Sequence, residues 1–396
     1  MRILLVNDGG APVGGAELQA LRLRELLRDR GHEVRLLAAD TGELGLPSQA
    51  DVTVHGTTHH KLRVLNQTVN PDAARVLRRE LARFRPDVVH VRMFLTQLSP
   101  TILPVLRDVP TIWQVVLHTA VCPRGTKMLP DGTACQVRAG RVCLDNDCVS
   151  RPTWLAAMIQ QRLWRRWSGA IDQVVTLSES MRTTLAANGI DDVEVIANGV
   201  PHRPPRPPLR DPPTIAFAGR LVPEKGADVL LEAVAALATT QPDLRTVVAG
   251  DGPQAAELRE RARTLGVDDR VRFLGHVDRD TVERELARAW VQVVPGRWPE
   301  PLGNVTLEAM ARGTAVIATA IGGPGEVVED GRTGLLVEPG SVGSLTAALA
   351  ELVTDRDRCE RLGAAGRVLA QQRYTEAATV DRFEALYARL TATSTR

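Results

Sequence analysis

Two cations stand close together in the segment 219–226, which reads GRLVPEKG. An apolar run precedes this segment and a helical pattern follows it, so Arg220 should end a strand and Lys225 should stand beside a helix N-terminus. Lysine is rare in this sequence, with three in the whole chain. Two cations and free backbone N–H groups would suit a diphosphate. The alternative is a polar strand-to-helix loop whose cations are simply solvated.

A second segment, 299–308 (PEPLGNVTLE), carries two glutamates across the expected start of a helix. Asn304 and Glu308 are four residues apart and share a helix face. The helix N-terminus could hold a phosphate while Glu308 accepts hydrogen bonds from a ribose diol, and Glu300 would be free to contact a sugar. The alternative is a helix whose acidic residues merely complement its dipole.

Apolar runs alternate with helical patterns along the whole chain, which predicts parallel sheets covered by helices on both faces. The strands expected in the first half are 2–7, 33–38, 52–55, 87–91, 111–116 and 173–177. Those expected in the second half are 214–218, 246–249, 271–274, 291–294 and 315–319. Helices are expected between them, for example at 16–30, 228–239 and 254–265.

A proline-rich stretch, 201–213, separates the two series because it can form neither a helix nor a central strand. It predicts a semi-rigid extended linker. We therefore expect doubly wound α/β domains at 1–200 and 214–374, and a last helix in 375–396 that packs back on the first domain. Ligands of open parallel sheets bind outside the carboxyl ends of the strands, so two such domains would face each other across a cleft.

Composition narrows the classes of function. The chain has 396 residues and a formal net charge of +2, which argues against a dedicated nucleic-acid binder. The apolar run after Met1 is too short for a signal peptide or a membrane span, and no other stretch is long enough. We expect a cytoplasmic protein, with peripheral contact at the inner face of a membrane as the open alternative.

Taken together, the motifs resemble those of the family 4 glycosyltransferases of the GT-B fold, which consist of two Rossmann-like domains. The matching residues are Gly219-Arg220 with Glu224-Lys225-Gly226, Gly250-Asp251-Gly252-Pro253, Glu300 with Glu308, Asn198-Gly199-Val200 and Gly14-Gly15-Ala16-Glu17. The resemblance covers essentially the whole chain. It is most specific in the second half, which holds the donor in this family.

The resemblance implies a retaining transfer of a hexose-type sugar from a UDP- or GDP-sugar. The acceptor would be a glycan, a lipid-linked glycan or a small molecule. Arg220 and Lys225 would neutralise the leaving diphosphate, as electrostatic catalysis requires when no metal or other cofactor does so. Glu300 would contact the transferred sugar and Glu308 the donor ribose.

The resemblance also assigns backbone roles. Gly303, Asn304 and Val305 would offer N–H groups to the phosphates. Gly219 would belong to the donor-binding set, and Gly15 would let the backbone approach the donor where a side chain would block it.

Two histidines end expected strands. His118 follows 111–116, where the family often has a His-Asp pair lining the sugar site, but Thr119 follows here and the match is partial. A structural or solvated histidine is the alternative. His90 is better explained as a residue satisfied by its own hydrogen bonds.

Two other functions fit parts of the pattern: a nucleotide-sugar epimerase of the same fold, and a catalytically silent nucleotide-sugar-binding protein. A dehydrogenase is disfavoured because the segment 8–14 (DGGAPVG) does not read GxGxxG.

Four cysteines, Cys122, Cys135, Cys143 and Cys148, fall within one loop-like insertion at 122–148. Four thiolates are a usual complement for tetrahedral zinc, so the insertion predicts either a structural zinc site or four reduced thiols.

A helix expected at 71–84 places Arg75, Arg78, Arg79 and Arg83 on one face. That face predicts either weak contact with an anionic membrane or plain solvation.

Overall fold

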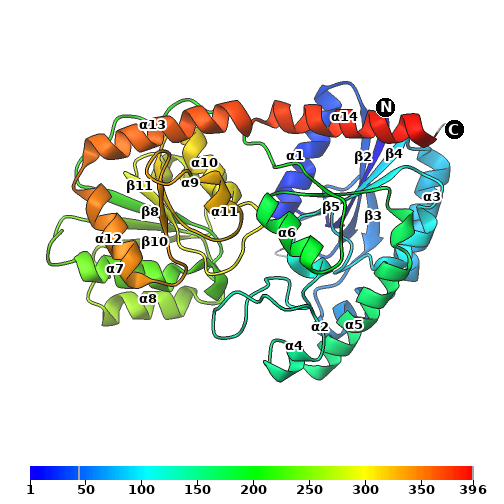
Figure 1. Cartoon of the computed structure of the whole chain (residues 1–396), viewed down its shortest axis with the longest axis horizontal. Helices are drawn as coiled ribbons and strands as arrows, with labels where there is room; N and C mark the ends of the chain where they lie inside the picture. The colour runs from blue at the N-terminus through cyan, green and yellow to red at the C-terminus, as the bar shows by residue number, and fades with distance from the viewer. Residues whose placement is uncertain (43–44, 395–396) are drawn as a thin grey trace.

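The computed structural model describes residues 1–42 and 45–394 and has two lobes, each built around one parallel sheet (Figure 1). Within those residues the first sheet has seven strands in the order β3-β2-β1-β4-β5-β6-β7. They are β1 (Arg2–Gly9), β2 (Glu33–Asp40), β3 (Val52–His55), β4 (Val88–Val91), β5 (Thr111–Val115), β6 (Gln173–Thr176) and β7 (Val193–Val195). The helices of this domain are α1 (Gly15–Asp29), α2 (His60–Asn66), α3 (Pro71–Phe84), α4 (Val142–Asp145), α5 (Arg151–Arg166) and α6 (Glu179–Ala187).

The second sheet has six strands among the described residues, in the order β10-β9-β8-β11-β12-β13. They are β8 (Thr214–Ala218), β9 (Arg245–Ala249), β10 (Val271–Gly275), β11 (Val291–Val294), β12 (Ala315–Thr319) and β13 (Leu335–Val337). Its helices are α7 (Ala227–Leu237), α8 (Ala255–Thr264), α9 (Arg279–Leu286), α10 (Asn304–Arg312), α11 (Gly322–Val327), α12 (Val342–Val353) and α13 (Arg356–Arg373). The last helix, α14 (Glu376–Ser394), follows α13.

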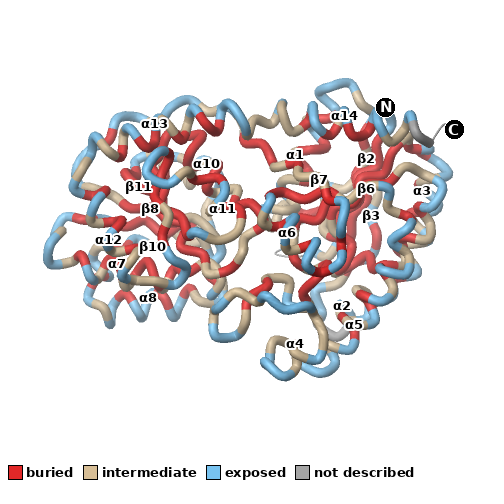
Figure 2. Tube along the Cα trace, viewed as in Figure 1, coloured by how far each residue is buried: buried red, intermediate tan, exposed pale blue. Residues whose placement is uncertain are grey.

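Burial explains why the central strands are mostly apolar. Every residue of β4, β5, β11 and β12 is buried, because helices cover both faces of each sheet (Figure 2). A strand covered on both faces has no solvent side, so its sequence shows no regular alternation of apolar and polar residues. The polar residues that these strands contain, such as His90 and Gln114, are buried as well.

Both sheets reverse their strand order at one place. The switch lies between β1 and β4 in the first sheet and between β8 and β11 in the second. Loops leave in opposite directions at such a point and open a crevice at the carboxyl ends of the strands. The segments that follow these four strands are therefore the ones that can build a ligand site.

The chain crosses between the lobes twice. The first crossing runs from β7 to β8, and the second lies between α13 and α14, which form the long run along one edge in Figure 1. Val200 N donates to Tyr374 O over 2.8 Å, so the two crossings are joined. In α14, Phe383 and Tyr387 are buried in one cluster with strands of the first sheet. Residues 395 and 396 of the expected segment lie outside the described residues.

The stretch 201–213 contains no helix or strand. It is nonetheless packed on the second domain. The Arg206 guanidinium donates to Glu360 over 2.7 Å and to Gly313 O over 2.8 Å, and Leu209 is buried. Hydrogen bonds to the domain surface, in addition to proline stiffness, fix its path.

The doubly wound α/β fold and the expected strands are confirmed, with ends that shift by one or two residues. The sequence did not predict β7 and β13, because three-residue strands are too short to show a period. None of the helices among the described residues has the length and apolarity needed to cross a bilayer.

Candidate active site

Lys225 and Glu300 meet where the loop after β8 faces the loop after β11. Lys225 Nζ donates to Glu300 Oε1 over 2.6 Å, and the side chains are 18% and 15% exposed. The two loops neighbour each other because β8 pairs with β11 at the switch point. The structure thus brings together two predicted residues that are 75 positions apart in the sequence.

Arg220 occupies the predicted place directly after β8, but it points to solvent. Its side chain is 73% exposed, and its nearest carboxylate oxygen is Glu224 Oε1 at 3.8 Å. An exposed ion pair of this length contributes little to stability. The guanidinium is therefore accessible to an anion, whereas the ammonium of Lys225 is already paired.

Two glycines next to this loop serve packing. A Cβ on Gly250 would lie 1.9 Å from Gly219 O, and one on Gly252 would lie 2.5 Å from Leu221 O. Both glycines have positive φ, +142° and +158°, which side chains rarely adopt. The Gly-Asp-Gly motif after β9 thus holds the backbone of the Arg220 loop in place.

The loop that carries Glu300 is fixed by a turn from α11. Gly323 N donates to Glu300 O over 2.7 Å. A Cβ on Gly322 would lie 2.5 Å from Glu300 N, and one on Gly323 would lie 2.3 Å from Leu302 Cα. This Gly-Gly turn was not among the predicted site residues. The signal was a glycine-rich segment directly after the strand β12, at the same edge of the sheet.

His118 contacts the same loop from the other domain. Its Nε2 donates to Pro299 O over 2.7 Å, and its ring lies edge-on to that of Trp298 with centroids 6.1 Å apart. Burial lowers the pKa of His118 to about 4, so the imidazole is neutral near pH 7. With Nε2 donating, Nδ1 is left as an acceptor.

Three buried polar atoms around this contact have no hydrogen-bond partner among the described residues. They are His118 Nδ1, Trp298 Nε1 and Glu300 Oε2. Lys225 Nζ also lies 5.5 Å from the centre of the Trp298 ring, so all four side chains gather at one place. Buried polar groups are normally paired, and two acceptors with one donor match what sugar hydroxyls can bind.

The helix α10 begins beside these residues with Gly303 as its N-cap. Gly303 has φ +77° and provides no side-chain cap, so the first N–H groups of the helix are left for other acceptors. Asn304 Oδ1 accepts from Asn198 Nδ2 over 3.1 Å, which ties this turn to the first domain. The carbonyl oxygen of Val305 accepts from Gln292 Nε2, so the group that Val305 can offer to a ligand is its backbone N–H.

Glu308 lies one turn further along the helix. Its side chain is 31% exposed, and Arg279 Nη2 lies 3.9 Å from Oε1. Burial raises the pKa of Glu308, and Arg279 acts in the opposite direction. The carboxylate is on the same helix face as Asn304, as the spacing predicts, and does not contact Lys225 or Glu300.

On the first domain, Gly15 starts α1, whose N-cap Gly14 also lacks a side-chain cap. A Cβ on Gly15 would meet nothing within 4 Å, whereas one on Gly14 would lie 2.6 Å from Glu17 Oε2. Space is therefore open over Gly15, whereas a side chain at Gly14 would displace the end of the Glu17 side chain.

A second contact joins the two domains through a helix N-terminus. The carboxylate of Glu326 in α11 accepts from Glu179 N over 2.9 Å and from Ser180 N, the first two residues of α6. A carboxylate here pairs N–H groups that helix geometry leaves free and complements the helix dipole. The sequence alone could not show it, because the two helices belong to different domains.

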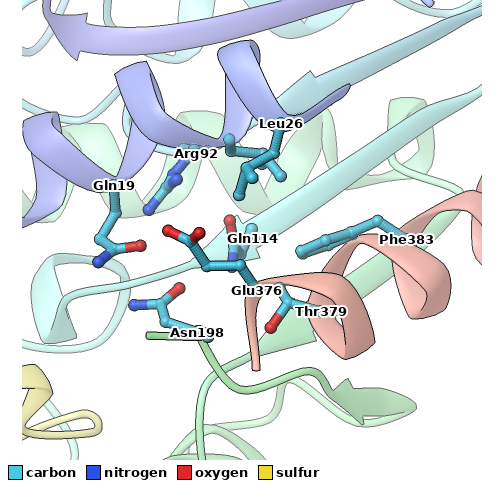
Figure 3. Close-up of a pocket in the computed structure, with 10 residues that line it drawn as sticks. Gln19, Leu26, Arg92, Gln114, Asn198, Glu376, Thr379 and Phe383 are labelled. Carbon is cyan, nitrogen blue, oxygen red and sulfur yellow. The ribbon is translucent and has the colours of Figure 1, made fainter. Parts of the chain in front are cut away.

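A small cavity of about 20 Å³, enough for one water, lies between α1 and α14. Figure 3 shows Gln19, Arg92, Asn198 and Glu376 converging on it. Arg92 is 3% exposed, burial lowers its pKa to about 10, and its Nε and Nη2 have no hydrogen-bond partner among the described residues. Glu376 is tied to α1 by Arg22 over 2.7 and 2.6 Å. These residues lie where the two crossings between the lobes meet α1.

His90 is satisfied by hydrogen bonds, as expected. Its Nδ1 lies 2.7 Å from Tyr387 Oη, and its Nε2 donates to Gln114 Oε1 over 3.1 Å. Because both ring nitrogens are occupied, His90 fastens α14 to the first sheet and takes no part in the candidate site.

The four cysteines of the insertion are free thiols gathered in one region. Burial raises the pKa of Cys143 and of Cys148, and the neighbouring thiols act in the same direction on both. No group of three or more His, Cys, Asp or Glu side chains within the described residues is arranged to hold a metal ion. The structural zinc site therefore stays a prediction. It would require the four insertion thiols to move closer to one another than they are in this structure.

Comparisons with known proteins show which family and which fold this chain resembles. Residues 13–204 match the family model described as Glycosyltransferase Family 4, and residues 202–369 match that of Glycosyl transferases group 1. A D-inositol 3-phosphate glycosyltransferase of Corynebacterium aurimucosum is 30% identical over 97% of this chain and 93% of its own.

Other relatives match over shorter stretches. Glycogen synthase of Mycobacterium tuberculosis is 31% identical over 72% of this chain, which spans 64% of that protein. A GDP-mannose-dependent phosphatidylinositol monomannoside mannosyltransferase of the same species is 41% identical over 42% of this chain, which spans 45% of that relative.

Among solved structures, sucrose-phosphate synthase from Thermosynechococcus elongatus has a TM-score of 0.77 at 23% identity, covering 99% of this chain and 100% of that one. Anabaena HepE in complex with UDP-glucose has a TM-score of 0.69 at 21% identity, covering 98% and 100%. These likenesses and the two facing sheets define a GT-B fold. The chain belongs to the family 4 glycosyltransferases.

Proposed function

We propose that this chain transfers a hexose-type sugar from a UDP- or GDP-sugar to an acceptor, with retention of the anomeric configuration and without a catalytic metal. The acceptor class is a glycan, a lipid-linked glycan or a small molecule. The observation that carries the proposal is the pairing of Lys225 with Glu300 beside the uncapped N-terminus of α10. It joins a cation for the leaving diphosphate to a carboxylate for the sugar.

Each part of a nucleotide sugar has a matching group. Arg220 and Lys225 supply positive charge as the diphosphate leaves, and the N–H groups of Gly303, Asn304 and Val305 add partial positive charge at the same place. Glu308 is left for the ribose diol. His118 Nδ1, Trp298 Nε1 and Glu300 Oε2 are left for sugar hydroxyls.

The comparisons support a nucleotide sugar as the donor class. HepE has been solved with UDP and with UDP-glucose, and one mycobacterial relative is named as GDP-mannose-dependent. Uracil and guanine therefore remain the two bases to test. Retention is the outcome that the family resemblance implies.

A panel of donors tests the proposal. The thermal unfolding temperature should rise with one of UDP, GDP or their sugars, because a ligand at 100 times its Kd adds about 2.7 kcal/mol of stability. The same labelled donor should then be hydrolysed slowly without an acceptor, and EDTA should leave this turnover unchanged. Interconversion of the sugar would instead indicate an epimerase, and binding without turnover a silent binding protein. Loss of turnover with EDTA, restored by magnesium or manganese, would overturn metal independence.

A further inference from the structure

Exposed large apolar residues gather on one part of the first domain. Five of the nine in the described chain lie on or directly after α2 and on α5. They are Leu62, Leu65, Val69, Leu155 and Ile159, with exposures of 53%, 62%, 42%, 55% and 39%. Single exposed apolar residues need no explanation, but such a group marks an interaction surface.

The outer face of α5 is a stripe with an apolar centre and arginine at both ends. Arg151, Leu155, Ile159, Arg162 and Arg166 follow one another at helical spacing, and all are exposed. The opposite face of α5 is buried in the domain through Ala156, Ala157, Gln160, Gln161 and Trp164. The stripe is thus the solvent side of a firmly anchored helix.

The helix α2 adds a second apolar row beside this stripe. Gln160 Nε2 of α5 donates to Gln67 O over 2.5 Å and to Leu95 O over 2.7 Å. This fixes the end of α2 against α5, and the two helices lie together at one end of the first domain in Figure 1. Leu62, Leu65 and Val69 are three and four residues apart and face solvent.

The charged side chains of these two segments are all positive. Neither segment 56–71 nor 148–171 contains Asp or Glu, although the chain as a whole carries only +2. Arg63, Arg151, Arg162 and Arg166 form no ion pair with a carboxylate in the part of the chain that the structure describes. The α3 face differs because it has no exposed large apolar residue among those described, and one of its arginines, Arg75, pairs with Asp72 over 3.0 Å.

We propose that this α2–α5 face, defined by Leu62, Leu65, Val69, Leu155, Ile159, Arg151, Arg162 and Arg166, binds the surface of an anionic lipid bilayer. Apolar side chains can enter the boundary between headgroups and acyl chains while arginines at the rim pair with lipid phosphates. Negative charge on the partner is required because the rim is uniformly positive. The membrane contact is therefore assigned to α2 and α5 and not to the basic face of α3.

Vesicle flotation without any donor tests this surface separately from the proposed transferase function. The full chain should float with phosphatidylglycerol vesicles and not with phosphatidylcholine vesicles, and binding should weaken as salt is added. Two variants, Leu65→Ser with Leu155→Ser and Arg151→Gln with Arg162→Gln and Arg166→Gln, should each bind at least about tenfold more weakly.

The matched control is Arg75→Gln with Arg78→Gln and Arg79→Gln, which removes the same charge from α3 and should bind as the wild type does. Unchanged melting temperatures and unchanged thermal shifts with nucleotide would show that the variants are folded. The proposal is overturned if the wild type does not float at low salt, if both lipids bind it equally, or if the control loses as much binding as the α5 variant. Sedimentation that shows a dimer lost in the Leu65→Ser/Leu155→Ser variant would assign the face to a second copy of the chain instead.

Discussion

Lys225 Nζ lies 2.6 Å from Glu300 Oε1 and joins the loops that follow two neighbouring strands. The carboxylate of Glu300 therefore balances the charge of the Lys225 ammonium. Under the proposed function, a diphosphate that entered the site would compete for Lys225, and the Glu300 carboxylate would then be free to face the sugar. The ion pair gives each of these two partly buried charges a partner, and a buried charge without a partner is costly.

Replacing Lys225 with Ala should lower kcat by about 10²–10³-fold and affect donor binding less, because negative charge on the diphosphate grows as the bond breaks. Glu300→Ala should behave similarly. Steady-state kinetics with the identified donor measures both, and Lys225→Arg, which keeps the charge, should retain more activity than Lys225→Ala. An active Lys225→Ala variant would mean that the segment 219–226 is only a loop.

Glu308→Ala should raise the donor KM and nearly keep kcat, since a ribose contact is equally strong in the ground and transition states. The readout is the separation of KM from kcat over a range of donor concentrations. Glu260→Ala, which removes an exposed carboxylate of α8, is the matched control and should change neither constant. A fall in kcat at constant KM would place Glu308 next to the reacting atoms.

Glu326→Ala should loosen the contact between the domains, because Glu326 caps α6 across the junction. Loss of an N-cap contact typically costs about 1 kcal/mol. Small-angle scattering should show a larger radius of gyration for the variant, and kcat/KM should fall a few-fold. Glu329→Ala removes a neighbouring carboxylate that pairs within its own domain with Arg332 and should leave the radius unchanged. An unchanged radius in both variants would show that this cap does not hold the domains together.

Protein purified without added metal should carry about one zinc per chain if the four insertion thiols draw together around an ion. Cys143→Ser should abolish the zinc content, whereas Cys359→Ser should keep it, because Cys359 is buried elsewhere and bonds to Leu352 O. Elemental analysis decides the matter. Zinc below about a tenth of an equivalent in the wild type would leave four reduced thiols as the explanation.

Stability should fall as pH drops below about 6.5, because burial lowers the pKa of His90 to about 3 and that of His118 to about 4. Both rings stay neutral in the folded chain, whereas in the unfolded chain both bind a proton. The free energy of unfolding therefore falls by about 2 kcal/mol per histidine as the pH drops from 7.5 to 5. Denaturant unfolding across this range should show a smaller pH slope in His90→Gln. The exposed His276→Gln is the control, and an equal slope in all three proteins would contradict the assignment.

The sequence by itself determined the two doubly wound domains and the positions of Arg220, Lys225, Glu300 and Glu308. Buried parallel strands must be continuous apolar runs, and the polar residues that follow such a run stand at the carboxyl edge of the sheet. Local order along the chain was therefore enough to place each residue at the correct edge.

Only the tertiary structure decided which groups meet there. The partner of Lys225, the bond from His118 to Pro299 and the cap that Glu326 gives to α6 join residues between 75 and 181 positions apart. No periodicity or motif encodes such pairs, because they depend on strand order and on how the two domains face each other. The same holds for the α2–α5 face, since a residue is exposed only where no other element of the fold covers it.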